Sequence, residues 1–284
     1  ADVACLVGGA TRRRNHQTVG QMNTAEASFN RLHAAARVRG AALAQLWLYR
    51  SHWQLPLPGA LMRRERDTLL SELMPAAIVI SLMVGTLLFV TLPSALGGAA
   101  ASAFSTLWPV WVVYGAPLTA AQALAMQRAP ALALELSQRH ARGEFAALTR
   151  LEASPAAYPG VPLLAAHALV AAAASFIIIA LTLVSGFLAS FVLAIGDLRQ
   201  AADAVFALVS PWSWLRSLLT AFLLGLSCSL ATMLYAWPGT QNTAAGVDAH
   251  RLGLRAMMIS SVAVVVVLVA LDWLINLLGF IKWW

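Results

Sequence analysis

The chain has 284 residues, of which 60% are hydrophobic and only 11% are charged, and its mean hydropathy is +0.73. Soluble domains carry about 25% charged residues, so the composition excludes an ordinary soluble protein and predicts an all-α integral membrane protein. The formal charge of +7 comes almost wholly from arginine. These arginines flank uncharged runs, which indicates membrane orientation and anionic lipid headgroups and argues against a nucleic-acid partner.

Residues 1–28 lack a sustained apolar stretch, and we expect them to be an upstream extension without folded structure. Residues 29–66 combine arginines with apolar side chains, which predicts an amphipathic helix in the membrane interface. Pro56 and Pro58 interrupt this segment, and a basic collar at residues 63–66 precedes the first span. The remainder, residues 67–284, is predicted to be one membrane domain.

Long stretches without Asp, Glu, Lys or Arg identify the membrane spans. Several exceed the roughly 20 apolar residues that cross the hydrocarbon core. We predict about five spans along the chain, at residues 73–92, 104–126, 161–195, 212–237 and 256–280. Alternation of arginine-rich and arginine-poor loops places the N-terminus in the cytoplasm and the C-terminus outside.

A compact polar stretch, residues 135–152, lies between the second and third predicted spans. Its length corresponds to about five helical turns. A charged helix held between two spans is well placed to be moved by a partner on one face of the bilayer. The loop alternation predicts that this face is cytoplasmic.

Catalytic chemistry is not indicated. The six histidines and two cysteines have no metal-ligand spacing, and no G-x-x-x-x-G-K-[ST] motif is present. Ser185 has no well-placed base, so an intramembrane protease is disfavoured, and small residues there favour close helix packing. We therefore expect neither a catalytic nor a metal site, and any nucleotide hydrolysis must occur on another chain.

Two charged positions within or beside the predicted spans are candidate functional residues. Asp272 lies inside the last span, where a carboxylate is costly unless it is paired or hydrated. It either faces a wet cavity or joins helices by a hydrogen bond, for example at Asn276. Arg128 shares a helix face with Glu135, seven residues away. Arg128 either has a function or is a boundary arginine that snorkels to the interface.

Several short patterns occur in a particular order. The stretch from Arg128 to Leu136 is similar to the pattern G-R-V-G-x-x-x-x-A-E-L-G. Proteins with this pattern also have an aspartate in their last span, at the position of Asp272. Further matches to D-A-L-x-x-M-x-x-D-P-x-x-Y-x-x-x-P and G-x-x-G-V-G-x-A-x-x-x-A-V are carried by Ala147, Leu148, Ser154, Pro155, Tyr158 and Pro162, and by Thr243, Gly246, Val247, Arg251 and Arg255. Over about residues 67–279 the chain resembles the MlaE (YrbE) permease family, membrane subunits of ABC transporters that work with MCE-domain proteins on lipids.

The resemblance implies a fold like that of type II exporters, with an interfacial N-terminal helix and five spans. It also implies a bacterial inner-membrane location, a lipid cavity enclosed with a second permease copy or a paralogue, and a cytoplasmic coupling helix at residues 131–152. Partners would be an ABC ATPase subunit, an MCE-domain protein and membrane phospholipid. ATP and Mg²⁺ would be on the ATPase, with no cofactor on this chain.

The resemblance also implies roles for individual residues. The candidates for coupling to the ATPase are Glu135, Arg139, Arg142, Glu144 and Arg150. The candidates for the lipid cavity are Arg128, Asp272, Tyr114 and Thr220.

The chain departs from the family pattern in the coupling segment. Where the family has E-Q-I-D-A-L, the acids are replaced by Gly143 and Ala146, and Glu144 stands one position late. The family's acid before the Gly-Pro of the second span is absent, and its fourth-span lysine falls near Thr220. Two hypotheses remain: a permease with remodelled ATPase contacts, or a non-transporting scaffold or degenerate half of a heterodimer.

Overall fold

The computed structural model describes residues 56–151, 157–192, 210–237 and 249–277, and the single positions 40, 44, 154, 205 and 207. The predicted extension at 1–28, nearly all of the predicted interfacial helix before Pro56 and most of the 238–255 loop lie outside these residues. So does the chain after Leu277.

The described residues form helices joined by short turns, without a strand, which confirms the predicted all-α fold. In chain order these are α2 (Pro56–Thr86), η2 (Leu87–Thr91), α3 (Leu92–Leu96), η3 (Gly97–Ala99), α4 (Ala100–Val110), η4 (Trp111–Gly115), α5 (Ala116–Ala141), α6 (Glu144–Arg150), α7 (Ala157–Val192), α9 (Pro211–Ala236) and α10 (Ala249–Leu277). The basic collar at 63–66 is part of α2, which begins at Pro56 and continues into the first span.

Within the described residues, four helices are long and apolar enough to cross a membrane: Met62–Leu96, Gly160–Val192, Pro211–Ala236 and His250–Ile275. The predicted span at 104–126 is helical but is not among these four. It contains Pro109, Gly115 and Pro117, and one of its sides is buried: Trp108 and Val112 have no exposed surface, whereas Leu107 and Val110 are 42% and 48% exposed. The structure therefore confirms an integral-membrane fold, and the fifth span stays a prediction.

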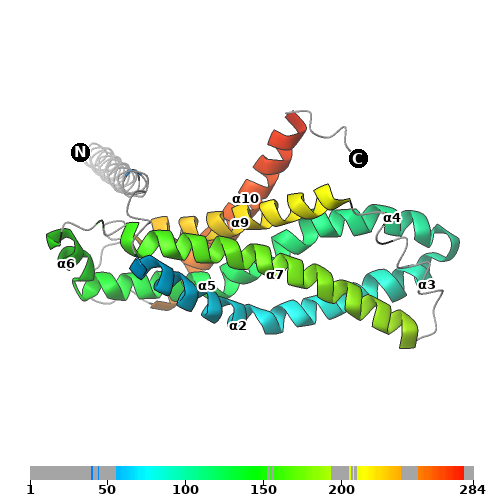
Figure 1. Ribbon diagram of the computed structural model, residues 1–284, viewed down its shortest axis with the longest axis horizontal. Helices are drawn as coiled ribbons and strands as arrows, with labels where there is room; N and C mark the ends of the chain where they lie inside the picture. Colours follow the sequence, from blue (N-terminus) through cyan, green and yellow to red (C-terminus); the bar gives the residue numbers. More distant parts are fainter. Residues whose placement is uncertain are drawn as a thin grey trace, which may run out of the picture.

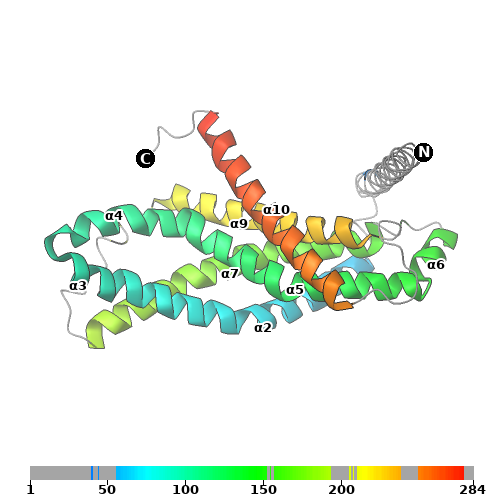
Figure 2. The ribbon, with the colours of Figure 1, turned by 180° about the vertical axis from the view of Figure 1, so that it is seen from behind.

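The long helices run lengthwise in an elongated bundle (Figure 1). Helix α2 packs along α7, α9 contacts both α5 and α7, and α10 rests on α5 and α9. Figures 1 and 2 both show the C-terminal half of α10 diverging from the other helices. The last turns of α5, the short helix α6 and the first turns of α2 and α7 lie together at one end of the bundle, which we call the polar end.

Small residues bring α2 and α7 into close contact. A Cβ atom on Gly85 would lie 2.6 Å from the carbonyl oxygen of Thr182. The hydroxyl of Ser81 donates to the carbonyl of Ile178 at 3.1 Å, and that of Ser185 donates to the carbonyl of Ser81 at 3.0 Å. Close backbone approach with interhelical hydrogen bonds is typical of membrane helix pairs, which confirms the packing role predicted for the small residues near Ser185.

The polar stretch is not one helix, so the prediction of a continuous helix over 131–152 is wrong. Helix α5 ends at Ala141, and Gly143 adopts a left-handed conformation with φ of 76° before α6 begins. The amide of Gly143 donates to the carbonyl of His140 at 2.9 Å, and that of Arg142 donates to the carbonyl of Gln138 at 3.0 Å. Glycine adopts positive φ without a steric penalty and commonly ends helices, so it separates the stretch into two helices that meet at a turn.

Candidate functional site

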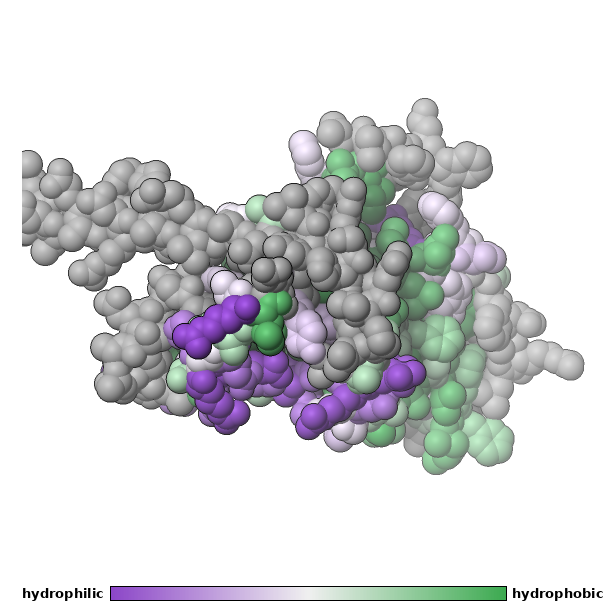
Figure 3. All heavy atoms as spheres, turned by 60° about the vertical axis from the view of Figure 1, so that its left-hand side comes forward, coloured by the Kyte–Doolittle hydropathy of each residue, from purple (hydrophilic) through white to green (hydrophobic). Residues whose placement is uncertain are grey.

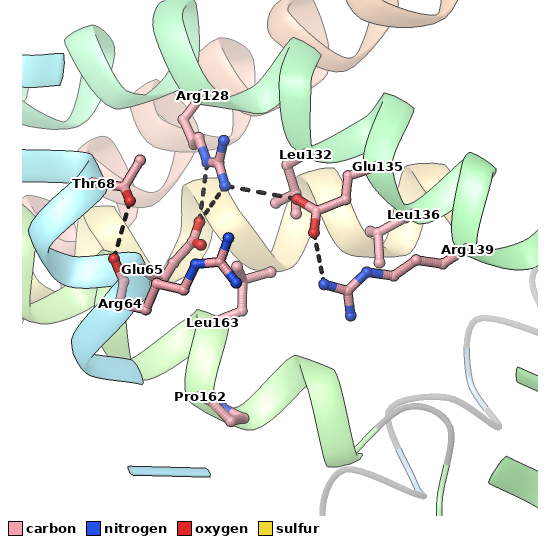
Figure 4. Close-up of a pocket in the computed structure, with 10 residues that line it drawn as sticks. All are labelled: Arg64, Glu65, Thr68, Arg128, Leu132, Glu135, Leu136, Arg139, Pro162 and Leu163. Carbon is pink, nitrogen blue, oxygen red and sulfur yellow. Dashed lines mark hydrogen bonds and ion pairs between the residues drawn. The ribbon is translucent and has the colours of Figure 1, made fainter. Parts of the chain in front are cut away.

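A network of four charged side chains joins α2 to α5 at the polar end. Arg128 donates from Nε and Nη2 to Glu65 Oε1, at 3.0 and 2.5 Å. The same Nη2 lies 3.6 Å from Glu135 Oε2, and Arg139 Nη2 donates to Glu135 Oε1 at 2.6 Å. We call Glu65, Arg128, Glu135 and Arg139 the polar-end network (Figure 4).

The centre of this network is largely withdrawn from solvent. The side chains of Arg128 and Glu65 are 14% and 21% exposed, whereas those of Arg139 and Glu135 are 35% and 39% exposed. The ion pair of Arg128 with Glu135 confirms that they share a helix face. Arg128 does not snorkel freely, because it is fixed to Glu65, a partner that sequence reasoning missed across 63 positions.

A pocket of about 310 Å³ opens beside the polar-end network. One face of α5 supplies half of its lining, and the rest comes from α2 and from the start of α7 (Figure 4). The lining residues are Arg64, Glu65, Thr68, Arg128, Leu132, Glu135, Leu136, Arg139, Pro162 and Leu163. The pocket thus combines guanidinium and carboxylate groups with aliphatic walls.

A second network joins η4, α9 and α10. Tyr114 Oη donates to Asp272 Oδ1 at 2.6 Å, and Arg216 Nη2 donates to Tyr114 Oη at 2.5 Å. Arg216 Nη2 lies 3.6 Å from Asp272 Oδ1, and the guanidinium carbon lies 5.2 Å from the centroid of the Tyr114 ring. We call Tyr114, Arg216 and Asp272 the Tyr114 network. The network shows that Asp272 joins helices by a hydrogen bond. The donor of this bond is Tyr114 and not Asn276.

Two of the predicted cavity residues, Tyr114 and Asp272, are therefore brought together, and Arg216 joins them although it was not among the predicted site residues. Its position as a charged residue within the predicted span 212–237 is the sequence signal that could have identified it. Thr220 lies one turn along α9 from Arg216 and is 7% exposed. Arg128 is not part of this group, because 14 residues of helix separate it from Tyr114, about 21 Å at 1.5 Å per residue.

A protein-family model described as Permease MlaE matches residues 63–274, well over half of the chain. The chain belongs to the MlaE permease family. It is thus a membrane permease subunit of the kind found in ABC transporters, and not a catalytic enzyme. Among curated proteins no match was found.

The family match includes both networks of this MlaE permease. It begins beside the first pocket residue, Arg64, and ends two residues after Asp272. The described residues contain no group of three or more His, Cys, Asp or Glu side chains arranged to hold a metal ion. At the polar-end network and the Tyr114 network, the permease instead has ion pairs between arginine and carboxylate side chains.

The local fold explains how Tyr114 reaches its partners. It lies in the five-residue π-helix η4, between Pro109 of α4 and Pro117 of α5. A π-helical turn contains an extra residue and often occurs at functional sites. The wider turn changes the direction in which the side chains before and after it point, so it sets where Tyr114 meets α9 and α10.

Helix α6 of the permease has one buried side and one exposed side. Phe145 is 7% exposed and its ring stacks on Trp237 with centroids 5.5 Å apart. Phe145 belongs to a core cluster that also contains Leu136 of α5 and Leu252 of α10. The inner side of α6 therefore packs against α5 and against Trp237, which follows α9, in a core cluster that also includes α10.

The predicted coupling residues fall into two groups. Glu135 and Arg139 belong to the polar-end network, and their side chains are partly enclosed. Arg142 and Glu144 lie at the turn, 3.8 Å apart, with side chains 69% and 43% exposed, and Arg150 is exposed at the end of α6. In the view from the polar end, hydrophilic residues gather toward the viewer and hydrophobic surface lies behind them (Figure 3).

Proposed function

We propose that this chain is the permease subunit of an MCE-linked ABC transporter that moves phospholipid-like molecules between the bacterial inner membrane and the periplasm or outer membrane. Partner ATPases would drive the movement. The observation that supports this best is a short helix, α6, held at the polar end between two long helices of an MlaE-family permease. The polar end would face the cytoplasm, as the arginine-rich loops predict.

The two sides of α6 suit a coupling element. Its outer side and the preceding turn present Arg142, Glu144 and Arg150 to a partner. Its inner side packs through Phe145 on Trp237, in a core cluster that includes the ends of α5, α9 and α10. A displacement of α6 by an ATPase would therefore be passed directly to those helices, because packed side chains transmit displacement rather than absorb it.

The lipid path would be completed by a second permease, either another copy or a paralogue. Helix α10 supports this, since only 11% of its most apolar window is buried within the protein. Its exposed apolar residues include Met258, Val262, Val266, Val269 and Trp273. Opposed to another permease, this surface would hold acyl chains, while Tyr114, Arg216, Asp272 and Thr220 would meet a headgroup.

Co-purification and transport assays test the coupling role. The chain should retain an ABC ATPase during purification, and charge reversal at Arg142, Glu144 and Arg150 should weaken that association and lower lipid transport. Reversal of Arg63, which is exposed on α2, is the matched control and should leave both unchanged. If no ATPase is retained and the α6 reversals leave transport intact, the proposed coupling is wrong.

A second candidate function is a non-transporting scaffold that assembles with MCE proteins, alone or as the weaker half of a heterodimer. The replacement of two family acids by Gly143 and Ala146 favours it, because Glu144 is left as the acid of α6. Reconstitution with the ATPase separates the two functions. ATP hydrolysis that rises when phospholipid is added, with this chain as the sole permease, would exclude the scaffold.

A further inference from the structure

We propose that the pocket between α2, α5 and α7 binds the phosphate of an anionic phospholipid from the leaflet at the polar end. This site is separate from the proposed lipid path at the Tyr114 network. Binding there requires neither an ATPase nor transport, so the inference does not depend on the proposed function.

The charge balance of the pocket favours an anion. Its lining has three arginines and two glutamates, which leaves a formal excess of one positive charge. Arg128 is paired with both glutamates, Glu65 and Glu135, through Nε and Nη2. The guanidinium of Arg64, in contrast, forms no hydrogen bond or ion pair with any residue that the structure describes. The hydroxyl of Thr68 donates to the backbone carbonyl of Arg64, not to its side chain.

Two guanidinium groups are placed to hold a phosphate together. Figure 4 shows Arg64 and Arg139 extending from α2 and α5 toward the space enclosed by the labelled residues. Arg139 uses Nη2 for its bond to Glu135, so its other N–H groups remain for a ligand. Arginine recognises phosphate well, because its planar fork donates several parallel hydrogen bonds.

The size and walls of the pocket favour a lipid headgroup. A volume of about 310 Å³ is at the lower end of the range for small-molecule sites, too small for a whole phospholipid. The aliphatic walls come from Leu132, Leu136, Pro162 and Leu163. A phosphate with its glycerol would fit between these walls and the arginines, with the acyl chains outside along the apolar helices.

The pocket lies at the charged start of a membrane helix. Arg64 is within the candidate span Met62–Leu96 but precedes its uncharged part, which begins after Glu72. Arginines at the ends of membrane helices lie among lipid headgroups, so Arg64 is at the part of α2 where we expect lipid phosphates.

Equilibrium lipid binding to the purified full-length chain tests the proposal. The chain, in neutral detergent and without ATPase, is titrated with phosphatidylglycerol, and bound lipid is counted by native mass spectrometry. Phosphatidylcholine and inorganic phosphate are titrated in parallel. Arg64→Ala and Arg139→Ala are compared with Arg63→Ala, which removes the neighbouring exposed arginine outside the pocket.

We expect Arg64→Ala and Arg139→Ala each to weaken phosphatidylglycerol binding about tenfold, the effect of one lost charge-assisted hydrogen bond. Arg63→Ala should change it less than twofold. Equal effects of Arg63→Ala and Arg64→Ala would overturn the proposal in favour of general surface charge. Phosphate binding as tight as that of the lipid would assign the site to a free anion. Lipid binding left unchanged by both Arg64→Ala and Arg139→Ala would also overturn the proposal.

Discussion

The ion pair between Arg128 and Glu65 allows a quantitative test of how the polar end is stabilised. Because Arg128 and Glu65 are only 14% and 21% exposed, removal of one partner leaves a largely desolvated charge. Breaking a fully buried pair costs about 3–5 kcal/mol. Here Glu135 still faces Arg128 at 3.6 Å, so we expect about 2 kcal/mol for Glu65→Gln. Arg128→Met leaves Glu65 facing no paired cation and should cost at least as much.

A double-mutant cycle measures the interaction itself. Unfolding of the detergent-solubilised chain by a denaturing detergent is followed for the wild type, for Glu65→Gln, for Arg128→Met and for the double variant. The double variant should be less destabilised than the sum of the single variants by at least 1 kcal/mol, because it leaves no uncompensated charge. Additive single effects, or neutral ones, would refute the argument that this pair is desolvated and coupled.

Three further predictions concern the Tyr114 network and α6. Tyr114→Phe removes the hydroxyl that links Arg216 to Asp272 and should lower the unfolding free energy by about 1–2 kcal/mol in the same detergent assay; a neutral result would show that the link is unimportant. Phe145→Ala should cost about 3 kcal/mol by loss of its contacts with Trp237 and the core, and should lower lipid-stimulated ATPase activity more than ATPase retention. Gly143→Ala meets no atom within 4 Å but strains a φ of 76°, which costs about 1–2 kcal/mol. By distorting the turn that joins α5 to the proposed coupling helix α6, it should uncouple ATP hydrolysis from transport while the chain still purifies as a folded protein; unchanged coupling would contradict a role of this turn in coupling.

Relations within one helix were predictable from the sequence, and relations between helices were not. Arg128 and Glu135 share a face because of helical periodicity alone, and the structure pairs them at 3.6 Å. Glu65 comes from a helix that precedes Arg128 by 63 positions, and Arg216 meets Tyr114 across 102 positions. No local pattern determines which face of one helix meets another, so these partners required the three-dimensional packing.

The end of α5 before Gly143 had a local sequence signal, although we predicted a continuous helix there. Arg139 and His140 occupy the last turn of α5 and Gly143 follows it closely, an order typical of a helix C-terminus. The resemblance to a family with one coupling segment favoured a continuous helix instead. The segment at 104–126 is helical as predicted, and a π-helix at Trp111–Gly115 lies between its two prolines.

The close contact at Gly85 distinguishes the helix pair α2–α7 from α10. A Cβ atom on Gly85 would collide with the backbone of α7, so the two helices are in close backbone contact at this position. We therefore expect α2 and α7 to move together. Helix α10 contacts α5 and α9, but only 11% of its apolar window is buried within the protein. If the permease changes shape during transport, we therefore expect α10 to move relative to the pair α2–α7.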